Sequence, residues 1–313
     1  MAVKPKLLVV GSSNVDFVSK IPRIPNAGET VISNSRYSFV PGGKGANSAV
    51  AAARLGGDVM FCARLGADTY GAELKRIYGE EKIDTRYVTL DKNAQTGFAS
   101  VMVEGNGQNR IIVFPGANNA LCTDDVEDAF LSYPDAVLTQ FEVNNDALTA
   151  TIKKANAASV PVFIDAGPAK QDFSVVGLEG IEIFSPNESE TYAYTGIRPG
   201  TADDCLYACM KLYNAMDVKY IVLKLGERGA FIYDGKYCEI AEAYNVTALD
   251  TTAAGDAFTA AMTLNYLENG GNITKAVRYA NAVGALTVMS EGALHSLPFA
   301  SQVEEFIEKA KNS

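Results

Sequence analysis

An aspartate stands at the start of a late helix, directly after a run of small residues. The run is Asp250-Thr251-Thr252-Ala253-Ala254-Gly255-Asp256, and residues 257–262 after it have a helical pattern. The first N–H groups of a helix are unpaired and carry partial positive charge, so a phosphate binds there when small residues let it approach. A carboxylate repels anions, so it does not suit a site that only binds phosphate. It does suit a site where Asp256 is a base that takes a proton from a hydroxyl attacking the phosphate. The alternative is that Asp256 only complements the helix dipole.

A second glycine-rich segment offers polar groups that suit a sugar. Pro41-Gly42-Gly43-Lys44-Gly45-Ala46-Asn47 leads into an alanine-rich helical pattern, and Gly11-Ser12-Ser13-Asn14-Val15-Asp16 follows the first apolar strand. A carboxylate such as Asp16 accepts two hydrogen bonds from neighbouring hydroxyls, and an amide such as Asn14 both donates and accepts. Glycines let the backbone close around a small ring. The alternative for Asp16 is a local Asx turn after the strand.

Other catalytic and nucleotide-binding motifs do not fit this chain. A P-loop needs a glycine five residues before its Gly-Lys pair and Ser or Thr after it, but Ser38 and Gly45 stand there. The dinucleotide fingerprint after the first strand and the protein-kinase signatures are absent. The single histidine, His295, excludes histidine-rich metal sites, and it excludes Ser-His-Asp or Cys-His catalysis unless it is itself the base. The chemistry therefore rests on carboxylates, lysine, backbone amides and a bound cation.

Length and composition describe an ordinary globular protein. The 313 residues are 48% hydrophobic and 20% charged, with a formal net charge of −10. This acidic balance disfavours nucleic acid and anionic membranes as partners. No apolar stretch approaches the roughly 20 residues needed to span a bilayer, and the apolar run 7–10 is too short for a signal-peptide core. The five scattered cysteines include no Cys-x-x-Cys pair, which predicts buried free thiols and a reducing, cytoplasmic location.

Short apolar strands alternate with helical patterns along most of the chain. We expect strands at 7–10, 59–62, 136–138, 162–164, 181–184 and 221–223, and helices at about 44–55, 71–78, 146–155, 188–194 and 203–213. This alternation predicts an α/β fold with a parallel sheet covered by helices on both faces. The β-rich segments 21–40 and 97–114 interrupt it, and within the second a turn-rich loop at 104–109 predicts a hairpin. These segments fit either edge strands of the main sheet or a separate small sheet.

Together the motifs resemble the two signatures of the ribokinase family of carbohydrate kinases, Gly-Gly-Lys-Gly-Ala-Asn at 42–47 and Asp-Thr-Thr-Ala-Ala-Gly-Asp at 250–256. The resemblance covers roughly residues 6–310. It implies a single domain over residues 1–313, built as a ribokinase-like three-layer α/β/α sandwich with a mainly parallel sheet. It also implies a small β-sheet lid over the sugar, with strands inserted from about 14–41 and 95–116. We expect a homodimer through this lid, because a protruding apolar sheet face must be covered.

The activity that the resemblance implies is ATP-dependent phosphorylation of D-ribose at its 5-hydroxyl. Asp256 is then the catalytic base, and the backbone of Ala253, Ala254 and Gly255 forms the anion hole. Other acceptors stay open, namely deoxyribose, fructose, a keto-deoxy sugar acid or a nucleoside such as adenosine. A non-catalytic sugar-binding protein on the same fold is a further alternative, against which the intact Asp256 and glycines argue.

The resemblance also assigns residues to the ligands. It places the sugar at Asn14, Asp16, Gly42, Gly43, Lys44, Asn47, Glu142 and Asp256, and the nucleotide at Asn187, Lys224, Gly226, Gly229, Gly255 and Asn281. Magnesium is contacted through water by Glu190, and an activating potassium ion is held by Asp250, Thr252, Thr287, Ser290, Gly292 and Ser296.

Three of these assignments have alternatives. Glu142 also suits a solvated or ion-paired loop acid. Asn187 and Glu190 have the spacing of a helix capping box. Lys224 stands where the family often has threonine, which leaves its contact with the nucleotide open.

Overall fold

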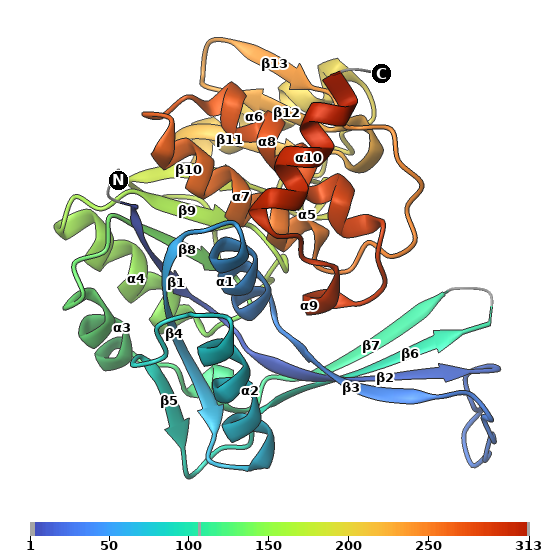
Figure 1. Cartoon of the computed structure of the whole chain (residues 1–313). Helices are drawn as coiled ribbons and strands as arrows, with labels where there is room; N and C mark the ends of the chain where they lie inside the picture. The colour runs from blue at the N-terminus through green and yellow to red at the C-terminus, as the bar shows by residue number, and fades with distance from the viewer. Residues whose placement is uncertain (1–3, 106–107, 312–313) are drawn as a thin grey trace.

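The computed structural model of the protein describes residues 4–105 and 108–311. The centre of the fold is a sheet of nine strands. All neighbouring strands run parallel except the last two at one edge, which are antiparallel to their neighbours. Each expected apolar segment lies within one of them. In spatial order the strands are β13 (Cys238–Ala241), β12 (Ala230–Tyr233), β11 (Val218–Lys224), β10 (Ile181–Ser185), β9 (Val162–Asp165), β8 (Ala136–Gln140), β1 (Lys6–Val10), β4 (Asp58–Gly66) and β5 (Val88–Asp91) (Figure 1).

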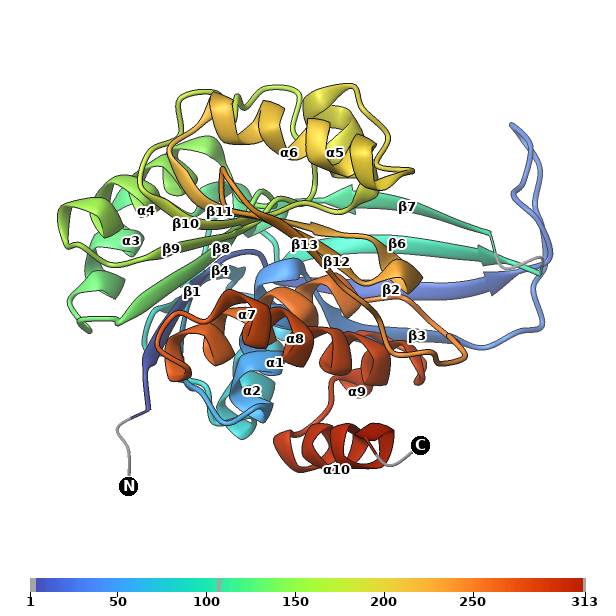
Figure 2. The same cartoon turned by 90° about the horizontal axis from the view of Figure 1, so that it is seen from above.

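Helices cover both faces of this sheet (Figure 2). One face carries α1 (Lys44–Arg54), α2 (Thr69–Glu80), α7 (Ala254–Glu268) and α8 (Ile273–Val288), with α9 (Ala293–Ser296) and α10 (Ala300–Lys311) beside them. The other carries α3 (Thr123–Phe130), α4 (Asn145–Ala157), α5 (Glu188–Thr195) and α6 (Ala202–Ala215). Short 3-10 turns are η1 (Gly116–Ala120) and η2 (Gly226–Arg228).

The strands are apolar because both of their faces are buried. In β1, Leu7 and Val9 pack into one helix layer, whereas Leu8 and Val10 pack into the other. All four side chains are fully buried. A parallel strand between two helix layers has no face toward water, so its sequence is a continuous apolar run. The predicted three-layer α/β/α arrangement is confirmed.

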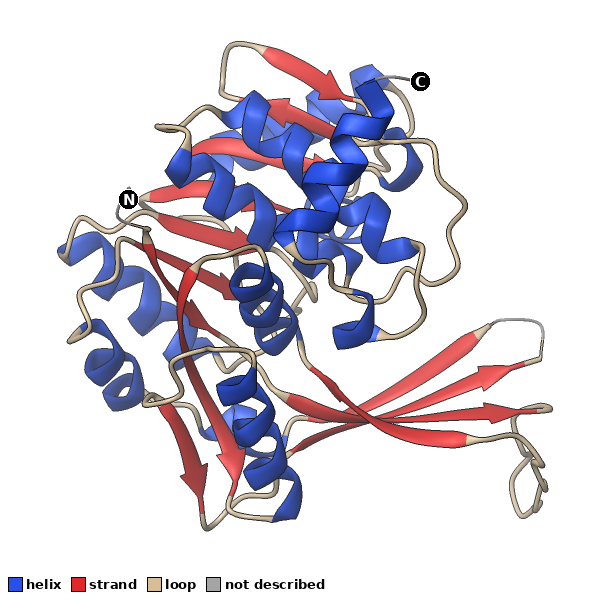
Figure 3. Ribbon diagram, viewed as in Figure 1, coloured by secondary structure: helices blue, strands red, loops and turns tan. Residues whose placement is uncertain are grey.

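A second, smaller sheet stands off the main body (Figure 3). Its strands lie in the order β3 (Tyr37–Gly42), β2 (Asn14–Ile21), β6 (Gly97–Glu104) and β7 (Asn109–Phe114). β2 and β6 are parallel, and the two outer pairs are antiparallel. The predicted β6–β7 pairing is confirmed, although residues 106 and 107 of its turn lie outside the described residues. The alternative of edge strands in the main sheet is wrong, because these segments form a sheet of their own.

Two predictions from composition can be compared with the structure. Cys62, Cys205 and Cys209 are buried free thiols, as predicted. The prediction is wrong for Cys122, which is partly buried, and for Cys238, which is exposed as the first residue of the edge strand β13. In the part of the chain that is described, no helix is both long and apolar enough to cross a membrane.

We expect Gly45→Ala to destabilise the protein strongly. The start of α1 lies so close to the chain after β1 that a Cβ atom on Gly45 would lie 2.5 Å from the carbonyl carbon of Gly11. Backbone cannot give way as a flexible side chain can, so we expect a loss of about 2–3 kcal/mol in the free energy of unfolding, measured by denaturant titration. Gly79→Ala in α2 is the control, because nothing lies within 4 Å of a Cβ atom there. Equal stability of the two variants would contradict this close packing.

Candidate active site

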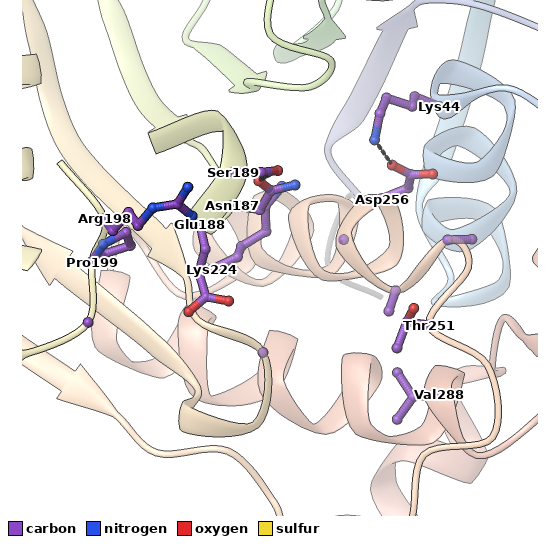
Figure 4. Close-up of a pocket in the computed structure, with 15 residues that line it drawn as sticks. Lys44, Asn187, Glu188, Ser189, Arg198, Pro199, Lys224, Thr251, Asp256 and Val288 are labelled. Carbon is purple, nitrogen blue, oxygen red and sulfur yellow. Dashed lines mark hydrogen bonds and ion pairs between the residues drawn. The ribbon is translucent and has the colours of Figure 1, made fainter. Parts of the chain in front are cut away.

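The first turns of α1 and α7 face each other across a buried carboxylate. Asp256, in the first turn of α7, has 4% of its surface exposed. Its Oδ1 atom accepts a hydrogen bond from Nζ of Lys44 at 3.1 Å (Figure 4). Its Oδ2 atom accepts one from Nδ2 of Asn47 at 2.8 Å. Positions three apart share a helix face, so one turn of α1 presents both donors. The structure thus brings both glycine-rich motifs of the sequence to one carboxylate.

The first turn of α7 leaves backbone donors open. Ala253, its N-cap residue, has a left-handed backbone with φ of 62° and provides no side-chain cap. Among the described residues no acceptor pairs with the N–H of Gly255 or Asp256, whereas the N–H of Ala254 points to the carbonyl of Thr251 at 3.3 Å. Unpaired N–H groups and the helix dipole attract an anion. Within the described part of the chain the N–H of Ala253 likewise has no acceptor, so the open donors at this turn belong to residues 253, 255 and 256.

Asp16 and Gly42 lie where strands of the small sheet leave the main body. Asp16 is within β2, so the alternative of an Asx turn after the strand does not apply. A Cβ atom on Gly42 would lie 2.2 Å from Oδ2 of Asp16, so glycine leaves the room that this carboxylate needs. Burial, together with the nearby carboxylates of Glu142 and Asp256, raises the pKa of Asp16 to about 7. Burial deprives the Asp16 carboxylate of water molecules that would donate hydrogen bonds to it. Hydroxyl groups of a ligand that donate to it instead would therefore stabilise its charged form.

Glu142 and Asn14 are oriented by buried partners. Oε2 of Glu142 accepts hydrogen bonds from Oγ of Ser12 at 2.5 Å and from the backbone N–H of Lys44 at 2.9 Å. Glu142 therefore caps the start of α1 from the loop that follows β8, as a partly buried acid with two hydrogen-bond donors instead of a solvated one. Oδ1 of Asn14 accepts a hydrogen bond from Nδ2 of Asn118 at 2.7 Å. The amide nitrogen is thus the group that Asn14 offers to a ligand.

A cavity of about 800 Å³ extends from Asp256 along the loops that follow β10 and β11 (Figure 4). Gly229 and Asn281 are not among its lining residues. With φ of 89°, Gly229 forms the turn into β12, and Asn281 donates to the carbonyls of residues 241 and 242. These two residues therefore shape loops beside the cavity. Its lining includes the predicted residues Lys44, Asn187, Lys224, Gly226, Ala253, Ala254, Gly255 and Asp256, with Arg198, Thr251 and Val288 among the others.

Asn187 and Glu190 form the capping box of α5, the alternative that their spacing allowed. Oδ1 of Asn187 accepts from the N–H of Glu190 at 2.9 Å, and Oε2 of Glu190 accepts from the N–H of Asn187 at 2.8 Å. Burial raises the pKa of Glu190. No group of three or more metal-ligating side chains occurs within residues 4–105 and 108–311. The hydrogen bonds between Asn187 and Glu190 stabilise the start of α5 beside the cavity.

The residues expected to hold potassium lie in chain segments that Asp250 ties together. Its Oδ1 atom accepts from the N–H and the hydroxyl of Thr252 at 2.9 and 2.6 Å, and its Oδ2 atom accepts from the N–H of Gly292 at 2.9 Å. Burial alone would raise the pKa of Asp250, but these hydrogen bonds lower it. Thr287, Ser290 and Ser296 lie in the adjoining turns. Their carbonyl and hydroxyl oxygens are the ligand type that suits a potassium ion.

Three residues belong to this site that the sequence analysis does not single out. Ser12 and Asn118 orient Glu142 and Asn14, as described above. Asp165, the last residue of β9, is fully buried and pairs with Lys224 at 2.6 Å. A carboxylate at the carboxyl end of a buried parallel strand is a usable signal for Asp165, because ligands bind at that edge of such sheets.

Known proteins resemble the chain over nearly its whole length. A family model described as pfkB family carbohydrate kinase matches residues 4–300. The ribokinase of Haemophilus influenzae is 33% identical over 312 residues, which cover 98% of this chain and 100% of that protein. A ribokinase of Arabidopsis thaliana is 34% identical over 303 residues, which cover 94% of this chain and 79% of that protein.

Solved structures agree with the sequence relatives. The structure of Arabidopsis thaliana ribokinase complexed with ribose and ATP has a TM-score of 0.89 and 32% identity, and the match covers 98% of this chain and 99% of that one. The chain therefore belongs to the pfkB family of carbohydrate kinases, which are phosphotransferases. The resemblance stated from its two glycine-rich motifs is confirmed.

Proposed function

We propose that the protein transfers the γ-phosphoryl group of ATP to the 5-hydroxyl of D-ribose, giving D-ribose 5-phosphate and ADP. The observation that carries this proposal is the position of Asp256. Its buried carboxylate accepts hydrogen bonds from Lys44 and Asn47 of α1, lies beside the open N–H groups at the start of α7, and is close enough to Asp16 of β2 to raise the pKa of that residue. The ribose and ATP named for the Arabidopsis thaliana relative support the same pair of substrates here.

The reaction follows from the roles of these groups. Asp256 takes the proton of the 5-hydroxyl as the hydroxyl oxygen bonds to the γ-phosphorus. The bond from that phosphorus to the β,γ-bridging oxygen breaks, and ADP leaves with the electron pair. The N–H of Gly255, the dipole of α7 and the ammonium of Lys44 stabilise charge on the moving phosphoryl oxygens. Asp16 and Asn14 hold the sugar ring so that its hydroxyl stays at the base.

The nucleotide occupies the cavity along α7. Asn187, Lys224 and Gly226 line it, while Gly229 and Asn281 shape the loops on its border. Glu190 would hold magnesium through water, and the ion would supply positive charge that offsets the charge of the phosphates. Gly42, Gly43 and Asn47 complete the sugar side, where glycine is required at 43 by a φ of 92°.

Potassium should raise the rate of phosphorylation more than sodium at equal ionic strength. A cation beside residues 250–252 would fix the loop that precedes Gly255 and add positive potential to the anion site. The smaller sodium ion fits carbonyl cages of this kind less well. Initial rates in potassium, sodium and a bulky organic cation check this. Equal rates in all three salts would remove the cation site from the proposal.

The remaining parts of the proposal concern shape and partners. The protein is one domain over residues 1–313, the small sheet is its lid, and two lids meet in a homodimer. Phe39, Ile112 and Phe114, each about half exposed on the lid, support a covering partner. The net charge of −10 supports an enzyme without nucleic-acid or membrane partners, and the buried free thiols support a reducing, cytoplasmic location.

A coupled assay for ADP release tests the proposed reaction. Ribose, deoxyribose, fructose, a keto-deoxy sugar acid and adenosine are offered in turn with ATP and magnesium. We expect the highest kcat/KM with ribose. A higher value for another acceptor would correct the substrate but keep the kinase. No ADP release with any acceptor would favour a non-catalytic sugar-binding protein.

A further inference from the structure

A buried ion pair stands beside the first turns of α7. The Nζ atom of Lys224, at the end of β11, lies 2.6 Å from Oδ2 of Asp165, at the end of β9. The hydroxyl of Thr259, on α7, donates to the same carboxylate oxygen at 2.8 Å. The strand β10 separates β9 from β11, so the lysine side chain reaches across a whole strand to its partner. Three elements are therefore joined by one charged contact.

The same ammonium group reaches the nucleotide cavity. Lys224 is among the residues that line this cavity, together with Gly255 and Asp256 (Figure 4). Of its three N–H donors, one is taken by Asp165 and one by the hydroxyl of Thr259 at 3.4 Å. A Cβ atom on Gly255 would lie 3.7 Å from Nζ, which is ordinary van der Waals contact. The third donor is thus available next to the open N–H of the anion site.

Stability alone gives little reason for burying this pair. The side chain of Lys224 is 11% exposed and that of Asp165 is fully buried. The free energy lost when two charges leave water is about as large as the free energy gained from their attraction. A protein with apolar side chains of similar size in their place is often equally stable. Lys224 and Lys44 together lower the pKa of Asp165, although burial alone would raise it. The ammonium groups of Lys224 and Lys44 and the carboxylate of Asp165 therefore lie beside the site proposed for the phosphates of the nucleotide.

We propose that Lys224 binds the phosphoryl group during its transfer, and that Asp165 and Thr259 are positioning residues that hold the ammonium at the anion site. The proposal rests on the proposed function, since it concerns the nucleotide side of the same reaction. Lys224 forms and breaks no covalent bond. It supplies preorganised positive charge beside Gly255, in the anion site proposed for the moving group. Asp165 acts only through Lys224.

Neutral variants separate this role from a structural one. Lys224→Met or Asp165→Asn alone leaves one buried charge without its partner, so each should lower the melting temperature. The double variant Lys224→Met/Asp165→Asn removes both charges and keeps similar volumes, so its melting temperature should return close to that of the unaltered protein. Its turnover should nevertheless stay about 100-fold low, with KM for the sugar changed less than about 3-fold. A double variant that regains full turnover would overturn the proposal in favour of a structural pair.

A matched control exists on the same strand. Lys219 of β11 forms a 2.6 Å ion pair with Glu182 of β10, outside the nucleotide cavity. The double variant Lys219→Met/Glu182→Gln removes one positive and one negative charge from two adjacent strands of the same sheet. Its turnover should equal that of the unaltered protein. A loss as large as that at Lys224 would show that any charge removal in this strand disturbs catalysis, which would also overturn the proposal.

Nucleotide binding without sugar distinguishes failure of this inference from failure of the proposed function. Calorimetry with AMP and with a non-hydrolysable ATP analogue measures both affinities for the unaltered protein and for Lys224→Met/Asp165→Asn. We expect the double variant to weaken the analogue about 10-fold while AMP changes little, because AMP lacks the distal phosphates. If the unaltered protein phosphorylates no acceptor, the proposed function fails, and this comparison of binding affinities alone then tests the role of Lys224. Equal weakening of both ligands, or of neither, would then overturn the role of Lys224.

Discussion

Asp256→Asn should lower turnover at least about 100-fold with little change in sugar affinity, because an amide keeps the shape of the side chain but takes no proton. The hydrogen bonds from Lys44 and Asn47 approach different oxygens of the carboxylate. An amide retains one of these acceptors, so the side chain stays in place. Turnover is measured by ADP release at saturating ATP, and the sugar dissociation constant is measured by calorimetry. A variant with unchanged turnover would refute the role of Asp256 as base.

The control for Asp256 is another acidic residue in the first turn of a helix. Asp203 is the corresponding exposed acid at the start of α6. Asp203→Asn removes the same favourable interaction with a helix dipole, which is worth a few tenths of a kcal/mol to about 1 kcal/mol in stability. Its turnover should not change. If both variants lost turnover equally, Asp256 would be only an acid that complements the helix dipole.

Asp16→Asn should weaken sugar binding about 10- to 100-fold and, at the same time, stabilise the ligand-free protein above neutral pH. The pKa of Asp16 is raised from 3.8 to about 7 in the fold, mainly by burial. At pH values between these two pKa values, the folded protein therefore keeps on Asp16 a proton that the unfolded chain releases. Stability falls as the pH rises through the interval, and the full penalty persists above it. Asparagine has no charge to bury and avoids the penalty.

The expected gain for Asp16→Asn at about pH 8 is roughly 2 kcal/mol in the free energy of unfolding, half of what the full shift would give, because the carboxylate is partly exposed. At about pH 5 the gain should be much smaller. Denaturant titrations at both pH values measure it. Asp58→Asn, at an exposed position that starts β4, controls for the general effect of removing one negative charge. An equal gain at both pH values, or an equal gain for Asp58→Asn, would contradict this account of Asp16.

The parallel core was predictable because each of its strands is an apolar run with both faces buried. Residues 162–164 are an example, since Val162 and Ile164 face one helix layer and Phe163 faces the other. The antiparallel strands β12 and β13 were not predicted. Residues 238–241 combine Cys, Glu, Ile and Ala, and three of the four are not buried. Their strand conformation comes from pairing with β12, which local sequence does not reveal.

The part of the candidate site at the start of α7 could be predicted because it is local in sequence. Small residues, a helix start and Asp256 fall within one short segment. The supporting contacts could not be predicted in the same way. Asn118 contacts Asn14 across 104 positions, and Asp165 contacts Lys224 across 59. Such pairs depend on strand order, which no single stretch of the chain specifies.

The residues proposed to bind the sugar lie at the base of the small sheet, where β2 follows β1 and β3 runs into α1. β2 contains eight residues, which at about 3.3 Å each make an arm of about 25 Å. A rotation of about 10° at the base of such an arm displaces its far end by about 4 Å. A sugar held at this base, as we propose, would therefore lie at the pivot of the small sheet. A small adjustment of the backbone around one sugar hydroxyl would move the far end of the sheet by a much larger distance.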